Sequence, residues 1–165
     1  MFDSHAHYDD RRFEDDRDAH LNYLFTAKGV KNIINIGCDM ESSRHSIALA
    51  DKYEQVYASV GVHPHDAKSV PKDYISLLEQ LLKHKKVVAV GEIGLDFHYD
   101  FSPRDIQRRV FAEQMQLAEK TGYPVIIHDR EAHKECVDTA LSFSKVTGVF
   151  HSYSGSIETA KILVK

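Results

Sequence analysis

The alternation of short apolar runs with segments of helical period is the feature that most limits how this chain can fold. Most of the runs are near-continuous stretches of Val, Ile and Ala, as in parallel strands buried on both faces. The six expected strands are Met1 to Asp3, Ile33 to Gly37, Val56 to Val62, Val87 to Val90, Pro124 to Ile127 and Val146 to Phe150. The segments between them carry apolar stripes and predict helices over Asp18 to Phe25, Ser42 to Tyr53, Tyr74 to Lys83, Asp105 to Lys120 and Ala132 to Phe143, with a last helix beginning at Ile157. Repeated βα units predict an α/β fold with a parallel sheet.

Composition narrows the class of protein. The chain has 165 residues, 42% hydrophobic and 28% charged, so we expect one globular domain over residues 1–165. A net charge of -4 argues against a broad basic surface for nucleic acid but allows local phosphate contacts. No apolar stretch approaches the length of a membrane span, and Cys38 and Cys136 form no metal or redox motif. We therefore expect a cytoplasmic protein with no membrane partner and two cysteines that are bystanders.

Potential metal ligands stand where several apolar runs end. His5 and His7 follow the first run, and Glu92, His128 and His151 follow the fourth, fifth and sixth. Residues two apart on a strand project from the same face, so His5 and His7 can bind one ion, although a lone His-x-His is weak evidence. The carboxyl ends of parallel strands meet at one face of the sheet. The sequence therefore predicts one shared site.

Other polar residues at the same face are candidates for binding substrate. His63 and His65 end the third run, where they either contact a substrate phosphate or belong to a structural turn set by Pro64. Arg130 lies two residues after His128, so it points into the site as a bidentate phosphate clamp or forms a surface salt bridge.

Three further residues each have two readings. Asp96 lies four residues past Glu92 and either supports the ligands or caps the following turn. Phe97 and Tyr153 either stack on a nucleobase or pack into the protein, and packing is the commoner fate of an aromatic ring.

Five ordered motifs together resemble the TatD-type deoxyribonucleases. They are Met1 to Asp9, Gly61 to His65, Gly91 to Asp96, Pro124 to Ala132 and His151 to Gly155. The resemblance implies a distorted TIM barrel that hydrolyses phosphodiester bonds in DNA, often as an exonuclease, with one to three divalent metals. It further implies that His5 and His7 hold one ion, that Glu92 is the catalytic carboxylate bridging two, and that His128 and His151 complete the second.

The ligand chemistry fits such a reaction. Two divalent ions about 3.5 to 4 Å apart hold both an attacking hydroxide and a scissile phosphate. Mixed imidazole and carboxylate ligands suit zinc or manganese, whereas magnesium prefers oxygen ligands. We expect two divalent ions, whose identity is left open among Zn, Mn and Mg.

The number of βα units is smaller than the resemblance implies. A complete barrel has eight strands and at least about 200 residues, whereas six units are recognisable here. The family's later Glu-Thr-Asp segment, with a further metal-binding aspartate, has no counterpart. We therefore expect a barrel truncated at its C-terminus, low nuclease activity for the chain alone, and either oligomers or aggregates that cover the open edges.

Two alternatives to a nuclease remain open. One is a relative in the same superfamily that cleaves amide or lactone bonds, since fold alone does not fix the substrate. Many such relatives carry a modified lysine where this chain has Glu92. The other is a non-catalytic metal-binding fragment.

Overall fold

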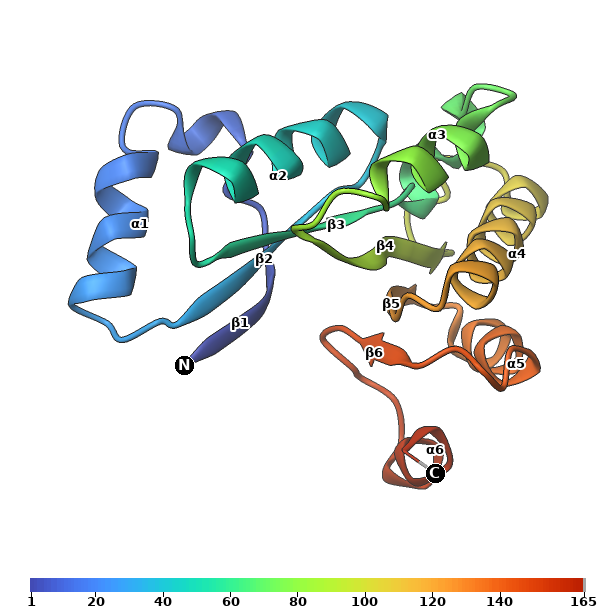
Figure 1. The fold of residues 1–165 in the computed structure, drawn as a ribbon. Coiled ribbons are helices and arrows are strands. Elements are labelled where there is room, and N and C mark those ends of the chain that lie inside the picture. Colours follow the sequence, from blue (N-terminus) through green and yellow to red (C-terminus); the bar gives the residue numbers. More distant parts are fainter. Residues whose placement is uncertain (165) are drawn as a thin grey trace.

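A computed structural model describes residues 1–164 and contains one parallel sheet of six strands. The strands are β1 (Phe2–Ala6), β2 (Asn32–Ile36), β3 (Val56–Val60), β4 (Val87–Asp96), β5 (Val125–Arg130) and β6 (Gly148–Phe150). Their order in the sheet follows the chain, so each strand pairs with the next, and β1 and β6 are the two edges of the described sheet. The sheet curls as the first part of a barrel does (Figure 1).

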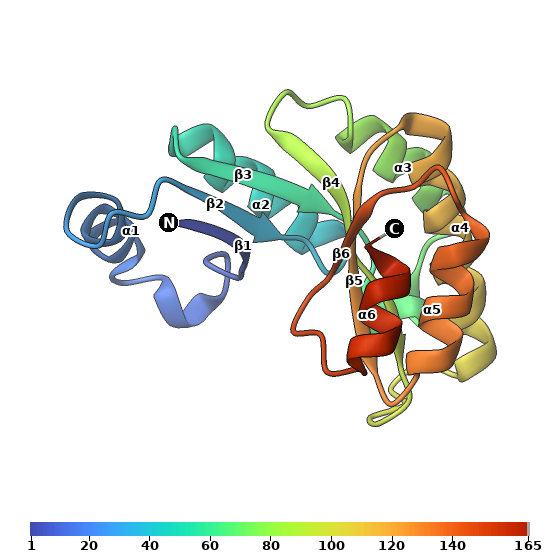
Figure 2. The same ribbon diagram turned by 90° about the horizontal axis from the view of Figure 1, so that it is seen from below.

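Six α-helices connect and cover the strands. They are α1 (Arg17–Thr26), α2 (Met40–Lys52), α3 (Tyr74–Leu81), α4 (Arg104–Thr121), α5 (His133–Ser142) and α6 (Ile157–Leu163), with short 3-10 helices η1 (Arg11–Phe13) and η2 (Pro64–Ser69). Figures 1 and 2 show the helices along the outer side of the curled sheet. Within residues 1–164, no helix combines the length and the apolarity needed to cross a membrane.

The sheet buries apolar side chains on both faces. On the outer face, Val90 and Ile93 pack in the same core as Phe111 and Met115 of α4, all at most 1% exposed. On the inner face, Ile36, Ala89 and Ile126 form a smaller cluster. Burial on both faces explains why the strands read as continuous apolar runs.

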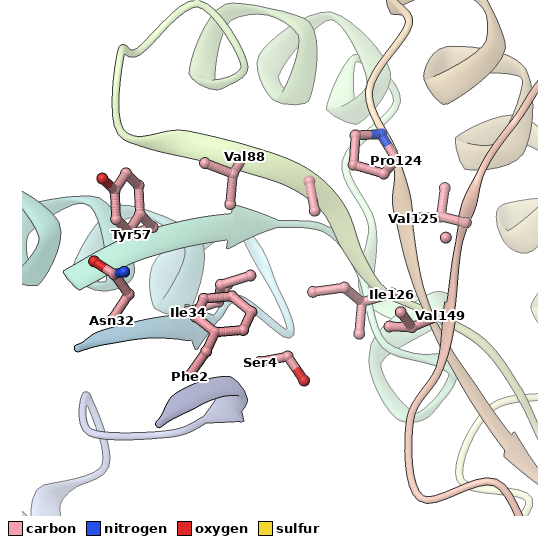
Figure 3. A pocket seen from close by; sticks show the side chains of 12 residues that line it. Phe2, Ser4, Asn32, Ile34, Tyr57, Val88, Pro124, Val125, Ile126 and Val149 are labelled. Atoms are coloured by element: carbon pink, nitrogen blue, oxygen red, sulfur yellow. The ribbon is translucent and has the colours of Figure 1, made fainter. Parts of the chain in front are cut away.

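The inner face also carries an apolar hollow of about 400 Å³ beside the amino-terminal halves of the strands (Figure 3). Its lining includes Phe2, Ile34, Tyr57, Val88, Ile126 and Val149. The histidines and carboxylates singled out by the sequence are not among its lining residues. The hollow is therefore the barrel interior rather than a polar reaction site.

The fourth and fifth strands are longer than the sequence predicts. We expected Glu92 and His128 to follow their strands directly, but β4 continues to Asp96 and β5 to Arg130. The prediction was wrong because backbone pairing between the two strands continues beyond the apolar residues, for example between Gly94 and His128. Gly94 has a φ of 139°, and a Cβ there would lie 2.0 Å from the His128 carbonyl oxygen, so only glycine fits this approach.

Two buried glutamines of α4 complete the backbone hydrogen bonding where β3 and β4 end. Gln114 accepts a hydrogen bond from the Val62 N–H at 2.8 Å and donates one to the Val62 carbonyl at 3.0 Å. Gln107 accepts a hydrogen bond from the Asp96 N–H at 2.9 Å and donates one to the Asp96 carbonyl at 3.1 Å. Each side chain thus replaces a neighbouring strand for one residue, which satisfies polar groups that would otherwise be buried alone.

We predict that Gln114→Leu destabilises the protein by about 2 to 6 kcal/mol, because two buried backbone groups at about 1 to 3 kcal/mol each lose their partners. Chemical denaturation followed by circular dichroism measures the change. The control is Gln116→Leu on the exposed face of the same helix, which should shift the free energy of unfolding by less than about 0.5 kcal/mol. Equal effects of the two substitutions would contradict the assigned role of Gln114.

Candidate metal centre

The buried carboxylate of Glu92 lies at the centre of the carboxyl face of the sheet. Glu92 is 3% exposed, and it is surrounded by imidazoles from β1, from β5 and from the residue that follows β6. Its Oε1 atom lies 2.6 Å from His151 Nε2 and 3.0 Å from His128 Nδ1, and its Oε2 atom lies 3.5 Å from His5 Nε2. The sequence expected these four residues to meet because parallel strands end at one face, and the structure brings them together.

His7 and Cys38 extend the cluster on the side of β1 and β2. His7 lies just past β1, and its Nε2 atom is 3.1 Å from His5 Nε2. Cys38 lies just past β2, with its Sγ atom 3.8 Å from Glu92 Oε2. Burial first, and the Glu92 charge second, raise the pKa of the Cys38 thiol well above its usual range. The interpretation of Cys38 as a bystander did not predict that its thiol lies beside Glu92. Its position directly after the second apolar run could have indicated this, because the other site residues also follow such runs.

The donor atoms fit a bound cation. Ligands of one zinc ion at about 2.1 Å lie roughly 3 to 3.5 Å from one another. His5 Nε2 and His7 Nε2 meet this spacing at 3.1 Å, as do His151 Nε2 and His128 Nδ1 at 3.4 Å. Ring nitrogens so close together either share a proton or direct their lone pairs at one cation.

Three sets of donors each lie within 4.8 Å and share Glu92. They are His5, Glu92 and His151; His7, Cys38 and Glu92; and His63, Glu92 and His128. In addition, the buried Nδ1 of His5 has no hydrogen-bond partner within residues 1–164. The residues present therefore suit a divalent ion bound beside Glu92.

Glu92 stays ionised despite its burial. Burial by itself would raise the pKa of a carboxyl group, but hydrogen bonds from His128, His151 and His5 outweigh it and hold the pKa well below the usual range. A negative charge is therefore fixed among the imidazoles, where it attracts a cation.

His63 lies beside Glu92 with a ring N–H that is able to donate a hydrogen bond. Burial lowers the pKa of His63 to about 3, so the ring is neutral near pH 7. Its Nδ1 atom accepts the backbone N–H of His65 at 3.2 Å, which places the ring proton on Nε2. That nitrogen lies 3.9 Å from Glu92 Oε1. His63 also caps η2 at Pro64, which is the structural turn that the sequence offered as the alternative, and its contact with a substrate phosphate stays a prediction.

Asp96 performs both roles that the sequence left open. Its Oδ2 atom lies 2.8 Å from His65 Nε2 and 3.1 Å from His128 Nε2, so it orients two imidazoles of the site. Its Oδ1 atom accepts the backbone N–H groups of His98 and Tyr99 at 3.0 and 2.9 Å, which caps the following turn. His65 is thus held by Asp96, with 26% of its side chain exposed.

Arg130 lies at the rim of the centre. Its Cζ atom sits 4.7 Å from the centroid of the Tyr99 ring. Across residues 1–164 its guanidinium forms no ion pair with a carboxylate, so the surface salt bridge considered from sequence is not formed. Its planar N–H groups remain free for an anion.

Parallel βα units whose carboxyl face gathers imidazoles around a buried carboxylate define a barrel-type fold with a candidate metal centre. The family model described as TatD related DNase matches residues 2–165, and the chain belongs to this family. The resemblance seen in the motifs and the expected TIM-barrel-like fold are thereby confirmed.

Relatives and solved structures agree with this assignment. An uncharacterized metal-dependent hydrolase, YabD of Bacillus subtilis (strain 168), is 34% identical over 100% of this chain and 65% of its own length. The 3'-5' ssDNA/RNA exonuclease TatD of Cronobacter sakazakii (strain ATCC BAA-894) is 35% identical over 98% of this chain and 62% of its own length. The crystal structure of the TatD homologue YjjV from Escherichia coli K12 superposes with a TM-score of 0.91 at 35% identity, covering 99% of this chain and 64% of that one. The chain thus spans somewhat less than two thirds of the length of these proteins.

We predict that the double substitution His128→Ala and His151→Ala weakens Zn²⁺ binding by more than about 100-fold. Replacing a residue that only supports a metal ligand already lowers metal affinity by about 10- to 100-fold, and loss of two ligands should lower it further. Isothermal titration of the metal-stripped protein measures the affinity, and elemental analysis measures the metal content.

The control replaces two histidines far from the cluster, His45 and His84, by alanine. His45 is exposed on α2, and His84 contacts Asp51 at 3.3 Å. This variant should bind zinc as the wild type does. Equal affinity of both double variants would show that His128 and His151 are not ligands.

Proposed function

We propose that the protein is a metal-dependent phosphodiesterase that hydrolyses DNA, and that Glu92 is the carboxylate around which its metal centre is built. The observation that carries this proposal is the buried, ionised Glu92 with imidazole nitrogens of His5, His128 and His151 within 3.5 Å. Membership of the TatD related DNase family supports a phosphodiester substrate.

His5, His7, Glu92, His128 and His151 would hold two divalent ions, with Glu92 between them. When bound, the ions would lower the pKa of a water molecule and offset negative charge on the reacting phosphate. Imidazole donors favour zinc or manganese over magnesium, and the soft sulfur of Cys38 beside Glu92 adds to the preference for zinc.

Other residues of the chain position the centre and the substrate. Asp96 accepts from His128 Nε2, which leaves Nδ1 facing Glu92 and fixes the orientation of that ring. The Nε2–H of His63 is placed to donate to a phosphate oxygen, and Arg130 at the rim can donate two parallel hydrogen bonds to the next phosphate. With a net charge of -4, the protein depends on such local groups to bind an anionic strand.

The names of relatives support a particular type of nucleic acid as the substrate. Several are named 3'-5' ssDNA/RNA exonucleases. We therefore propose that a single strand is the substrate and that cleavage proceeds from its end.

We predict that Glu92→Gln lowers turnover of a labelled single-stranded oligonucleotide by at least about 100-fold in the whole protein, because it removes the negative charge between two cations. A gel-based time course with added metal, and with chelator as the zero-activity reference, measures the rate.

The matched control is Glu119→Gln on the exposed surface of α4, which should leave the rate unchanged. Circular dichroism spectra of both variants should match the wild type. If Glu92→Gln retained the rate of Glu119→Gln, the metal-bridging role would be wrong.

The exposed edges of the sheet lead to a further prediction about assembly. In the described sheet, β1 and β6 each lack a second neighbour, and Phe2 and Val149 on these edges are 57% and 46% exposed. Edge strands with free backbone groups and apolar side chains pair readily with another chain. We predict that the 165-residue polypeptide self-associates as its concentration rises, as measured by multi-angle light scattering. A constant monomeric mass at all concentrations would refute this.

A further inference from the structure

An aromatic pair stands exposed at the rim of the metal centre. Tyr99 and Phe101, called here the aromatic platform, are 46% and 54% exposed. Their rings stack with centroids 5.2 Å apart at an interplanar angle of 20°. The centroids of the Tyr99 and Phe101 rings lie 5.5 and 4.8 Å from the centroid of the His65 ring, in edge-to-face arrangements. His65 is bound to the same Asp96 carboxylate as His128. The aromatic platform therefore lies next to the proposed reaction site.

The chain holds this pair in place before any ligand binds. Asp100, between the two aromatic residues, adopts a left-handed conformation with φ of 50°. Arg104 holds the Asp100 carboxylate through its Nε and Nη2 atoms at 2.6 to 3.0 Å and also donates to the Phe97 carbonyl at 3.1 Å. Asp96 accepts the Tyr99 N–H at 2.9 Å. Little conformational entropy remains to be lost when a flat ligand docks.

The electrostatics beside the aromatic platform favour an anion. The Arg130 guanidinium lies over the Tyr99 ring and pairs with no carboxylate among residues 1–164. Two exposed acids beside the aromatic platform are engaged, Asp100 by Arg104 and Glu131 by His98 at 2.7 Å, and the buried Asp96 is bound by His65 and His128. A flat apolar surface beside a free cation matches a ligand that joins an aromatic ring to a negative charge, as a nucleotide does.

We propose that the aromatic platform stacks on a nucleobase of the bound strand while Arg130 contacts the adjoining phosphate. This proposal rests on the proposed function and names a base-binding subsite for it. The sequence offered Phe97 and Tyr153 as base-stacking candidates, with packing into the protein as the commoner fate. Phe97 is only 8% exposed beneath Arg104 and Arg108, and the Tyr153 hydroxyl donates to the Ser156 carbonyl at 2.9 Å.

The subsite has a consequence for selectivity. A base can stack on the aromatic platform only after it leaves its own stack and pair, so an unpaired strand end fits and an intact duplex does not. Every base has a flat aromatic face, so this contact does not select a sequence.

The test compares a short fluorescein-labelled oligothymidylate with an abasic strand of the same length, which keeps the sugars and phosphates but lacks the bases. Fluorescence anisotropy with the whole protein in chelator gives both affinities without cleavage. The wild type should bind the oligothymidylate about 5- to 100-fold more tightly than the abasic strand, as expected for one or two aromatic stacks. The Tyr99→Leu, Phe101→Leu double variant should bind both strands equally.

Three further variants separate the contacts. Phe101→Trp keeps a flat ring and should preserve the preference for bases even if the double leucine variant folds poorly. Arg130→Gln should weaken binding of both strands by a similar factor, because it removes a phosphate contact. Tyr23→Ala, which removes an aromatic residue of α1 that is 50% exposed, should change neither affinity.

The outcomes distinguish this inference from the proposed function. Equal binding of the two strands by a wild type that hydrolyses DNA would overturn the base-binding subsite and leave the nuclease intact. An unchanged preference in the double leucine variant would also overturn it. If the wild type neither bound nor cleaved either strand in the presence of metal, the nuclease proposal and this subsite would both fail.

Discussion

The buried carboxylate of Glu92 is the constraint on which the rest of the site depends. A charge this deeply buried is costly unless it is paired, and its nearest partners are imidazoles from strands that are distant in sequence. Those imidazoles lie close to one another as well as to the carboxylate. This arrangement of donor atoms suits a bound cation, and the fit follows from the geometry before any relative is considered.

A short series of hydrogen bonds fixes the positions of the side chains in this centre. Gln107 of α4 holds both backbone groups of Asp96. Asp96 in turn orients His65 and His128 with one oxygen and caps the turn leading to Tyr99 with the other. The helix layer, the metal centre and the aromatic platform are therefore coupled through one buried carboxylate. Placing binding groups on such supported elements keeps their geometry close to what the reaction needs.

The two ends of the sheet serve different purposes. The amino-terminal halves of the strands enclose an apolar hollow, whereas the carboxyl face carries the titratable groups. The same division between a packed interior and a reactive face is general in α/β barrels.

The sequence by itself determined the repeating βα pattern, the family and the gathering of His5, Glu92, His128 and His151, because parallel strands necessarily end at a common face. It did not determine that Cys38 approaches Glu92, or that Asp96 both orients two imidazoles and caps the following turn. Nor did it determine that Tyr99 and Phe101 are exposed while Phe97 is buried. These features depend on strand register, on backbone pairing beyond the apolar runs and on the left-handed turn at Asp100. Periodicity reports which face a residue occupies, but only tertiary packing decides which residues from distant strands meet there.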